Sequence, residues 1–217
     1  MSRGRKFKVN RIIKFLIYSD FLLIGGEGFV TPIVAVFVTR NIEGATIATV
    51  GFAVTIYWVV KSLAQLPIAR FIDRYDGEED DYWFMFSGAL MYGLLFFAYC
   101  FISQIWQFYL VQGLLGLSMA CAFPGYSALF TRHIDKHEEG MEWSLHSLAV
   151  GAGYAGAASL GGVIAERAGF PVVFALAASI IVLGALSLLL IRREFVKHEK
   201  CAENFKIPRI NGRGRSS

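Results

Sequence analysis

The stretch GFPVVFALAASIIVLGALSLLLI, from Gly169 to Ile191, contains no charged side chain. It is long enough to cross a bilayer as a helix, which takes roughly 20 apolar residues. Because lipid offers the backbone no hydrogen-bond partner, a crossing segment must be a helix or a strand of a closed barrel. The stretch lacks the polar alternation of a barrel strand. It therefore predicts a transmembrane helix.

Five more apolar stretches of similar length precede this one. They are Ile12–Val38, Ile47–Ala69, Tyr82–Ile102, Ile105–Phe130 and Trp143–Ala165. The composition agrees, with 55% hydrophobic and only 18% charged residues. A soluble all-α protein with buried helices is the competing interpretation, but six such runs in one short chain disfavour it. We predict an all-α polytopic membrane protein with six transmembrane helices.

The positive charges predict an orientation. The basic N-terminal run could be mistaken for a secretion signal, but Asp20 and Glu27 interrupt the apolar stretch behind it, and no convincing small-residue cleavage site follows. Most of the 21 Lys and Arg residues lie in the two tails and in the two longer loops, whereas Arg40 and Arg167 lie on the opposite side. The positive-inside rule then places both termini in the cytoplasm of a cell inner or plasma membrane.

We expect three parts along the chain. Residues 1–11 form a basic cytosolic tail, residues 12–192 form the six-helix transmembrane domain, and residues 193–217 form a second basic tail that we expect to be disordered. The basic residues from Arg192 to Arg215 could contact anionic lipid headgroups of the bilayer. No nucleic-acid partner is predicted, because the topology of the membrane segments already explains the charge.

No catalytic or cofactor chemistry is predicted. Three cysteines make no disulfide framework. His133 and His137 are four residues apart and could share a helical face, but no further metal ligands accompany them. No phosphate-binding loop and no nucleophile with a base is evident at membrane depth. We therefore expect no cofactor, no metal and no enzymatic activity.

The second apolar stretch ends in ARFIDRYDG, from Ala69 to Gly77. It resembles the signature between helices 2 and 3 of the major facilitator superfamily, which runs glycine, three residues, Asp-Arg, one residue, glycine and then basic residues. Asp73 and Arg74 match its centre, Ala69 replaces the first glycine, Gly77 is displaced by one position, and acidic residues 78–81 stand in place of the basic ones. The resemblance implies that Asp73 and Arg74 belong to a charge network that favours one conformation of a carrier.

The fifth apolar stretch resembles the glycine-rich fifth helix of the same family. Its motif consists of Gly153, Gly156, Gly161 and Gly162. Small residues at such spacing let helix backbones approach closely. Ala158 takes the place of the proline that is usual in the antiporter version, so the motif does not indicate antiport. With Gln112–Gly116, which is similar to part of the family's fourth helix, the resemblance covers residues 12–192.

This resemblance implies one half of a carrier. Carriers of the superfamily usually have two six-helix halves, each built from two inverted three-helix repeats. An even number of helices puts both ends of this chain on one side, so two copies can associate in parallel about a two-fold axis. We expect a homodimeric secondary transporter that moves a small organic solute by alternating access. The alternative is a non-transporting membrane subunit, or a half-carrier that works only with a different six-helix partner.

Three ionisable residues fall at membrane depth, Asp20 and Glu27 in the first stretch and Lys61 in the second. A charge at the bilayer centre costs at least about 2.5–3.5 kcal/mol, so each needs a partner, a water-filled cavity or a function. Asp20 and Lys61 lie at similar distances from the basic ends of their helices, which predicts that they form an ion pair. An ion pair between Lys61 and Glu27 is the alternative.

Glu27 lies nearer the bilayer centre, among Gly25, Gly26 and Gly28. Without a cationic partner it is expected to favour the protonated form, because burial disfavours the charge. A carboxyl group that gains and loses a proton as a cavity faces each side can couple transport to protons. We predict a proton-coupling or cation-binding site at Glu27, and the alternative is a permanently neutral Glu bonded to the helix backbone. The glycines and the pair Thr31-Pro32 predict a locally irregular first helix.

Aromatic residues of three stretches could provide a surface for an organic substrate by stacking or cation–π contact. They are Tyr18, Trp58, Phe123 and Tyr126. Because the ionisable residues include two carboxyl groups, a cationic or amphiphilic compound is favoured over an anion. The sequence does not identify the substrate further.

Overall fold

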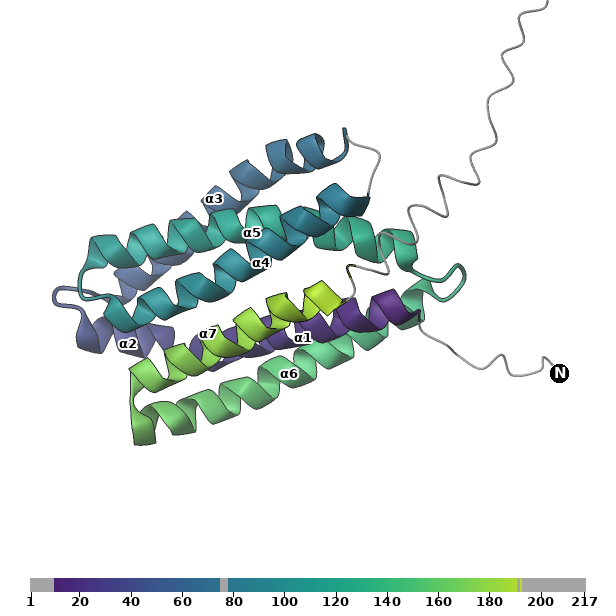
Figure 1. The fold of residues 1–217 in the computed structure, drawn as a ribbon. Coiled ribbons are helices and arrows are strands. Elements are labelled where there is room, and N and C mark those ends of the chain that lie inside the picture. Colours follow the sequence, from purple (N-terminus) through teal and green to yellow (C-terminus); the bar gives the residue numbers. More distant parts are fainter. Residues whose placement is uncertain (1–9, 75–77, 191, 193–217) are drawn as a thin grey trace, which may run out of the picture.

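The computed structural model describes residues 10–74, 78–190 and 192. The tails at residues 1–9 and 193–217, and Tyr75 to Gly77 of the predicted signature, lie outside the described residues. Figure 1 shows a bundle of long helices that run roughly along one axis. The described residues form helices and no strands. In chain order the helices are α1 (Arg11–Val30), α2 (Val34–Asn41), α3 (Ile47–Ile72), α4 (Glu78–Ala98), α5 (Ile105–His133), α6 (Glu139–Ala168) and α7 (Phe170–Ser187), with short 3-10 turns at Tyr99–Phe101 and Leu188–Leu190.

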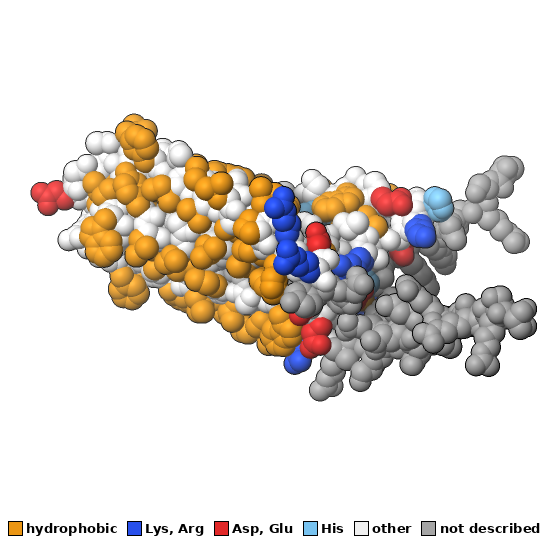
Figure 2. All heavy atoms as spheres, turned by 90° about the horizontal axis from the view of Figure 1, so that it is seen from above, with side chains coloured by type: hydrophobic (Ala, Val, Ile, Leu, Met, Phe, Trp, Pro, Cys, Tyr) orange, Lys and Arg blue, Asp and Glu red, His pale blue; other side chains and the backbone are white. Residues whose placement is uncertain are grey.

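These helices provide the six predicted membrane spans. The pair α1 and α2 forms one span over Arg11–Asn41, and each of the other five long helices forms one. Large apolar side chains remain exposed along them. Figure 2 shows one face on which hydrophobic side chains are spread along the length of the bundle, while most of the visible charges gather toward one end. In water such a surface would drive aggregation. The protein is therefore an integral membrane protein, as the sequence predicted.

The first span is broken between its two helices. Pro32 has no N–H group to continue the helix, and residues 31–33 form a turn. The Thr31 hydroxyl and the Thr31 N–H both donate to the Glu27 carbonyl, at 3.1 and 3.0 Å. The break confirms the irregularity predicted at Thr31-Pro32, and it lies one turn beyond Glu27. The glycines do not interrupt the helix, since α1 runs continuously through Gly25, Gly26 and Gly28.

The helices pack in a symmetric pattern. Helix α1 packs against α6 and α7, and α5 packs against α3 and α4 in the same relation, while α4 contacts α7 between them. This arrangement is the one expected of two three-helix repeats, the first with α1, α3 and α4 and the second with α5, α6 and α7. Helices α3 and α6 consequently lie at the two ends of the row of packed helices.

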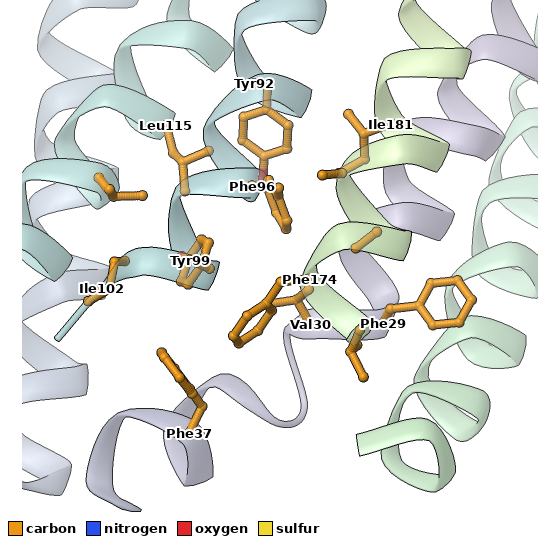
Figure 3. Close-up of a cluster of buried hydrophobic side chains, with 14 of the residues drawn as sticks. Phe29, Val30, Phe37, Tyr92, Phe96, Tyr99, Ile102, Leu115, Phe174 and Ile181 are labelled. Carbon is orange, nitrogen blue, oxygen red and sulfur yellow. The ribbon is translucent and has the colours of Figure 1, made fainter. Parts of the chain in front are cut away.

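The centre of the bundle has a large apolar cluster near the α2 end. The Phe37 ring meets the Phe174 ring edge-on at 4.8 Å, and the Tyr99 ring lies 5.2 Å from Phe174 (Figure 3). A second cluster, around Leu16, Tyr82 and the Phe130 side chain, fills the opposite end. Such aromatic contacts bury large areas in fixed geometries. Together the two clusters hold α1, α4, α5 and α7 around the site described below.

Candidate functional site

A cavity of about 220 Å³ lies between α1, α3, α4 and α5. It is lined by Glu27, Val30, Thr31, Val34, Val54, Tyr57, Trp58, Tyr92, Phe96, Tyr99, Gln112 and Leu115. Most of its wall is aromatic or aliphatic, and the polar groups are one carboxyl, one amide and several hydroxyls. Small-molecule sites usually have this composition, with few polar groups in an apolar wall.

Glu27 lies in this cavity together with two tyrosines. Tyr92 of α4 and Tyr57 of α3 line the same cavity as Glu27, and both interact electrostatically with its carboxyl group. The Glu27 carboxyl group of α1 thus shares one cavity with hydroxyl groups from α3 and α4.

Gln112 and Tyr99 form a second polar pair in the cavity wall. The Gln112 Nε2 atom donates to the Tyr99 hydroxyl at 3.1 Å, in a buried position. Tyr99 lies in the 3-10 turn that follows α4, and Gln112 belongs to the stretch that resembles the fourth helix of the family. The pair connects α5 to the end of α4 beside the large aromatic cluster.

Lys61 lies among aromatic rings instead of pairing with Asp20. Its Nζ atom is 4.7 Å from the centroid of the Trp58 ring and 5.2 Å from that of Phe123. Lys61 and Glu27 also interact electrostatically, without a direct ion pair between them in the structure. The predicted pair of Asp20 with Lys61 is wrong, since α1 packs on α6 and α7 whereas α3 packs on α5.

Asp20 instead contacts a residue that the sequence reasoning missed. Its Oδ2 atom lies 2.6 Å from the His146 Nε2 atom of α6. The two side chains are only 19% and 15% exposed. A single histidine within an apolar helix was the available signal, and its partner could not be assigned before the packing of α1 against α6 was known.

The predicted charge network at the end of α3 has a neighbouring ion pair. Arg132 of α5 pairs with the buried Asp81 at the start of α4, and Asp73 interacts electrostatically with Asp81. Asp73 and Arg132 also line a second cavity, of about 450 Å³, between α3 and α5. Arg74 follows directly after the last turn of α3. The acidic run at 78–81, which departs from the family signature, therefore contributes Asp81 to the same region.

The glycine motif of α6 divides into two faces. A side chain at Gly153 would lie 2.8 Å from the Phe21 ring of α1, and one at Gly161 would overlap the backbone of Phe29. Gly156 and Gly162 have open space beside them. The first pair thus permits close packing within the bundle, and the second pair lies on a face that the described residues leave uncovered.

The four candidate aromatic residues do not gather at one site. Trp58 lines the first cavity and Phe123 the second. The Tyr126 hydroxyl is buried without a hydrogen-bond partner in the described structure, and its ring lies 5.8 Å from the His146 ring. Tyr18 is half exposed and lines neither cavity.

A membrane protein whose helices enclose a largely apolar cavity with a few polar groups resembles a transporter or a channel. The comparisons with known proteins distinguish between these two classes. The family model of the Major Facilitator Superfamily matches residues 16–210. The chain therefore belongs to the Major Facilitator Superfamily of transporters. This confirms the resemblance found in its sequence.

Relatives and a solved structure agree with this family. An uncharacterized MFS-type transporter of Methanocaldococcus jannaschii is 23% identical over 77% of this chain and 42% of its own length. The proton-coupled antiporter flippase LtaA of Staphylococcus saprophyticus is 23% identical over 70% of this chain and 38% of its own length. The multidrug resistance protein MdtG of Enterobacter lignolyticus is 38% identical over 43% of this chain and 22% of its own length. The crystal structure of the POT family transporter PepTSo matches 87% of this chain and 39% of that chain, with a TM-score of 0.73 at 17% identity. The chain thus spans less than half the length of each of these proteins.

Proposed function

We propose that this chain is one half of a secondary transporter that moves a small organic solute by alternating access and uses Glu27 to couple transport to protons. The observation that carries the proposal is the position of the Glu27 carboxyl group in a cavity between α1, α3, α4 and α5. A carboxyl group in a cavity can take up a proton from one side of the membrane and release it to the other.

The surroundings of Glu27 suit this role. The helix ends one turn later at the Thr31 break, so α1 and α2 can change their relative angle there. Tyr92 lines the same cavity, and its hydroxyl can serve the carboxyl group in either protonation state, because a hydroxyl can both donate and accept. A proton on Glu27 would therefore change how α1 and α4 interact across the cavity.

We propose a cationic or amphiphilic organic compound as the substrate. Trp58, Tyr57 and Phe96 give the cavity an aromatic wall, which favours cations and planar groups. Two relatives carry related descriptions, one as a proton-coupled antiporter flippase and one as a multidrug resistance protein. The cavity of this chain alone is small for a drug-sized molecule, so a second wall is needed.

The second wall in this proposal is another copy of the chain, in a parallel homodimer. In the most apolar part of α3 and of α6, only 11% of the residues are buried within the bundle. The corresponding share in the other four spans is 39–44%. The open glycines Gly51, Gly156 and Gly162 lie on these two helices and would permit close approach of another bundle. A two-fold axis beside α3 and α6 would close the cavity that holds Glu27.

The distribution of basic residues supports an orientation with both termini in the cytoplasm. In this orientation the second cavity, with Asp73 and Arg132, opens near the cytoplasmic ends of α3 and α5. We propose that Asp73 and Arg74 act there with the Arg132–Asp81 pair to stabilise one conformation of the transporter.

Proton coupling is tested in liposomes that contain the purified protein. We expect an imposed pH gradient to drive movement of ethidium, an aromatic cation, with wild-type protein and not with Glu27→Gln. Glu27→Asp keeps the carboxyl group and serves as the control that retains pH dependence. Full gradient-driven movement by Glu27→Gln would refute the assignment of Glu27.

The homodimer is tested by cross-linking in mild detergent. In a background with the three native cysteines replaced by serine, Gly156→Cys places a thiol on the open face of α6, whereas Gly153→Cys places it against Phe21 within the bundle. We expect a short thiol cross-linker to give dimers only from Gly156→Cys. A monomeric mass for a protein that still transports would end this part of the proposal.

A further inference from the structure

The pair of Asp20 and His146 lies outside the cavity of Glu27. It joins α1 to α6 through a contact of 2.6 Å between the Asp20 Oδ2 and His146 Nε2 atoms. Neither side chain lines either of the two cavities described above. A carboxyl group and an imidazole at hydrogen-bond distance bind protons as a coupled pair.

Aromatic rings enclose the imidazole. The Phe130 ring of α5 lies 5.6 Å from it edge-on, and the Trp143 ring lies 5.6 Å away at an angle of 88°. The Tyr126 ring is 5.8 Å distant, and its buried hydroxyl has no hydrogen-bond partner in the described structure. These rings keep the pair largely away from lipid and leave an unused hydroxyl beside it.

The titratable groups around the imidazole come from three helices. Asp20 faces it from α1 and Tyr126 from α5, and Tyr126 also interacts electrostatically with Asp20. On α6 itself, Glu142 lies one turn earlier, but its Oε2 atom accepts from the Asp135 N–H at 3.2 Å. Asp20 is therefore the carboxylate that acts directly on His146.

We propose that Asp20 and His146 form a second proton-binding site. Its charge acts electrostatically on Glu27, which lies on the same helix α1. Asp20 and Glu27 lie two helical turns apart, about 10 Å along the axis, and they interact electrostatically in the structure. Histidine is the side chain that changes charge between about pH 5 and 8. Proton binding by the pair stands independently of the proposed transport, whereas its effect on coupling at Glu27 rests on that function.

The site can be read out optically, because an imidazolium quenches an adjacent indole more strongly than a neutral imidazole does. The chain has four tryptophans, so replacing Trp58, Trp83 and Trp106 by Phe leaves Trp143 as the single reporter. We expect its emission to change between about pH 5 and 8 in the purified protein. We expect no such change after His146→Gln.

The role of Asp20 is tested with Asp20→Asn in the same background. The midpoint of the fluorescence change should move, because the carboxylate and the imidazole take part in one equilibrium. Glu27→Gln should keep the transition, which separates this proposal from the role of Glu27 in transport. If the three tryptophan replacements prevent folding, the wild-type chain is compared with Trp143→Phe as a blank. An emission that does not depend on pH through His146, or a midpoint that Asp20→Asn leaves unchanged, would overturn the proposal.

Discussion

The glycine at position 161 gives a sharp test of how α6 is held against α1. A Cβ atom at Gly161 would lie 2.9 Å from the Phe29 Cα atom and 3.0 Å from the Phe29 carbonyl carbon. These are backbone atoms, so the strain can be relieved only by moving one helix away from the other. Overpacking of this kind costs about 1–3 kcal/mol, while replacing a helical glycine by alanine returns about 0.5–1 kcal/mol.

We therefore predict that Gly161→Ala lowers the free energy of unfolding by up to about 2.5 kcal/mol. For a chain of this size that corresponds to a fall in Tm of up to about 10 °C, measured by thermal unfolding of the purified protein in detergent. The neighbouring Gly162 has open space beside it, so Gly162→Ala should keep or raise the Tm. Equal Tm changes for the two variants would refute the close contact between α6 and α1.

Two further predictions concern charged groups. Arg132→Gln removes an ion-pair partner of the buried Asp81 and should lower the free energy of unfolding by about 1–3 kcal/mol. Asp81→Asn in the same chain should restore most of this loss. A double variant as unstable as Arg132→Gln alone would contradict this prediction. Lys61→Met should raise the Tm or leave it unchanged, because cation–π contacts give about 0.5–2 kcal/mol while an ammonium at membrane depth costs about 2.5–3.5 kcal/mol. A clear fall in Tm for Lys61→Met would show that the aromatic contacts outweigh the cost of burial.

The helices were predictable because each follows from a local property of the sequence. Length and the absence of charge define a span, and Pro32 with Thr31 defines the break in the first one. Glu27 could be singled out because an acidic residue at membrane depth requires a partner, a water-filled cavity or a function. The family signature around Asp73 could be recognised because all of its residues lie in one continuous stretch of the sequence.

The contacts of the charged residues were not predictable from position along a helix. Depth along the axis made Asp20 and Lys61 candidate partners, but depth does not say which face of a helix meets which neighbour. The structure places Asp20 against α6 and Lys61 beside α5. His146 and Tyr92 could be identified only in the structure, because α6 packs on α1 beside Asp20 and Tyr92 of α4 lines the cavity of Glu27.

The most direct test of the account is whether water reaches position 27. In the background without native cysteines, Glu27→Cys is treated with a membrane-impermeant, water-soluble maleimide in liposomes, beside Leu176→Cys on the exposed surface of α7 as a lipid-facing control. We expect the thiol at position 27 to react and the thiol at position 176 not to react, because only a hydrated thiol ionises readily. Equal lack of reaction at both positions, from either side of the membrane, would contradict a solvent-accessible transport cavity at Glu27.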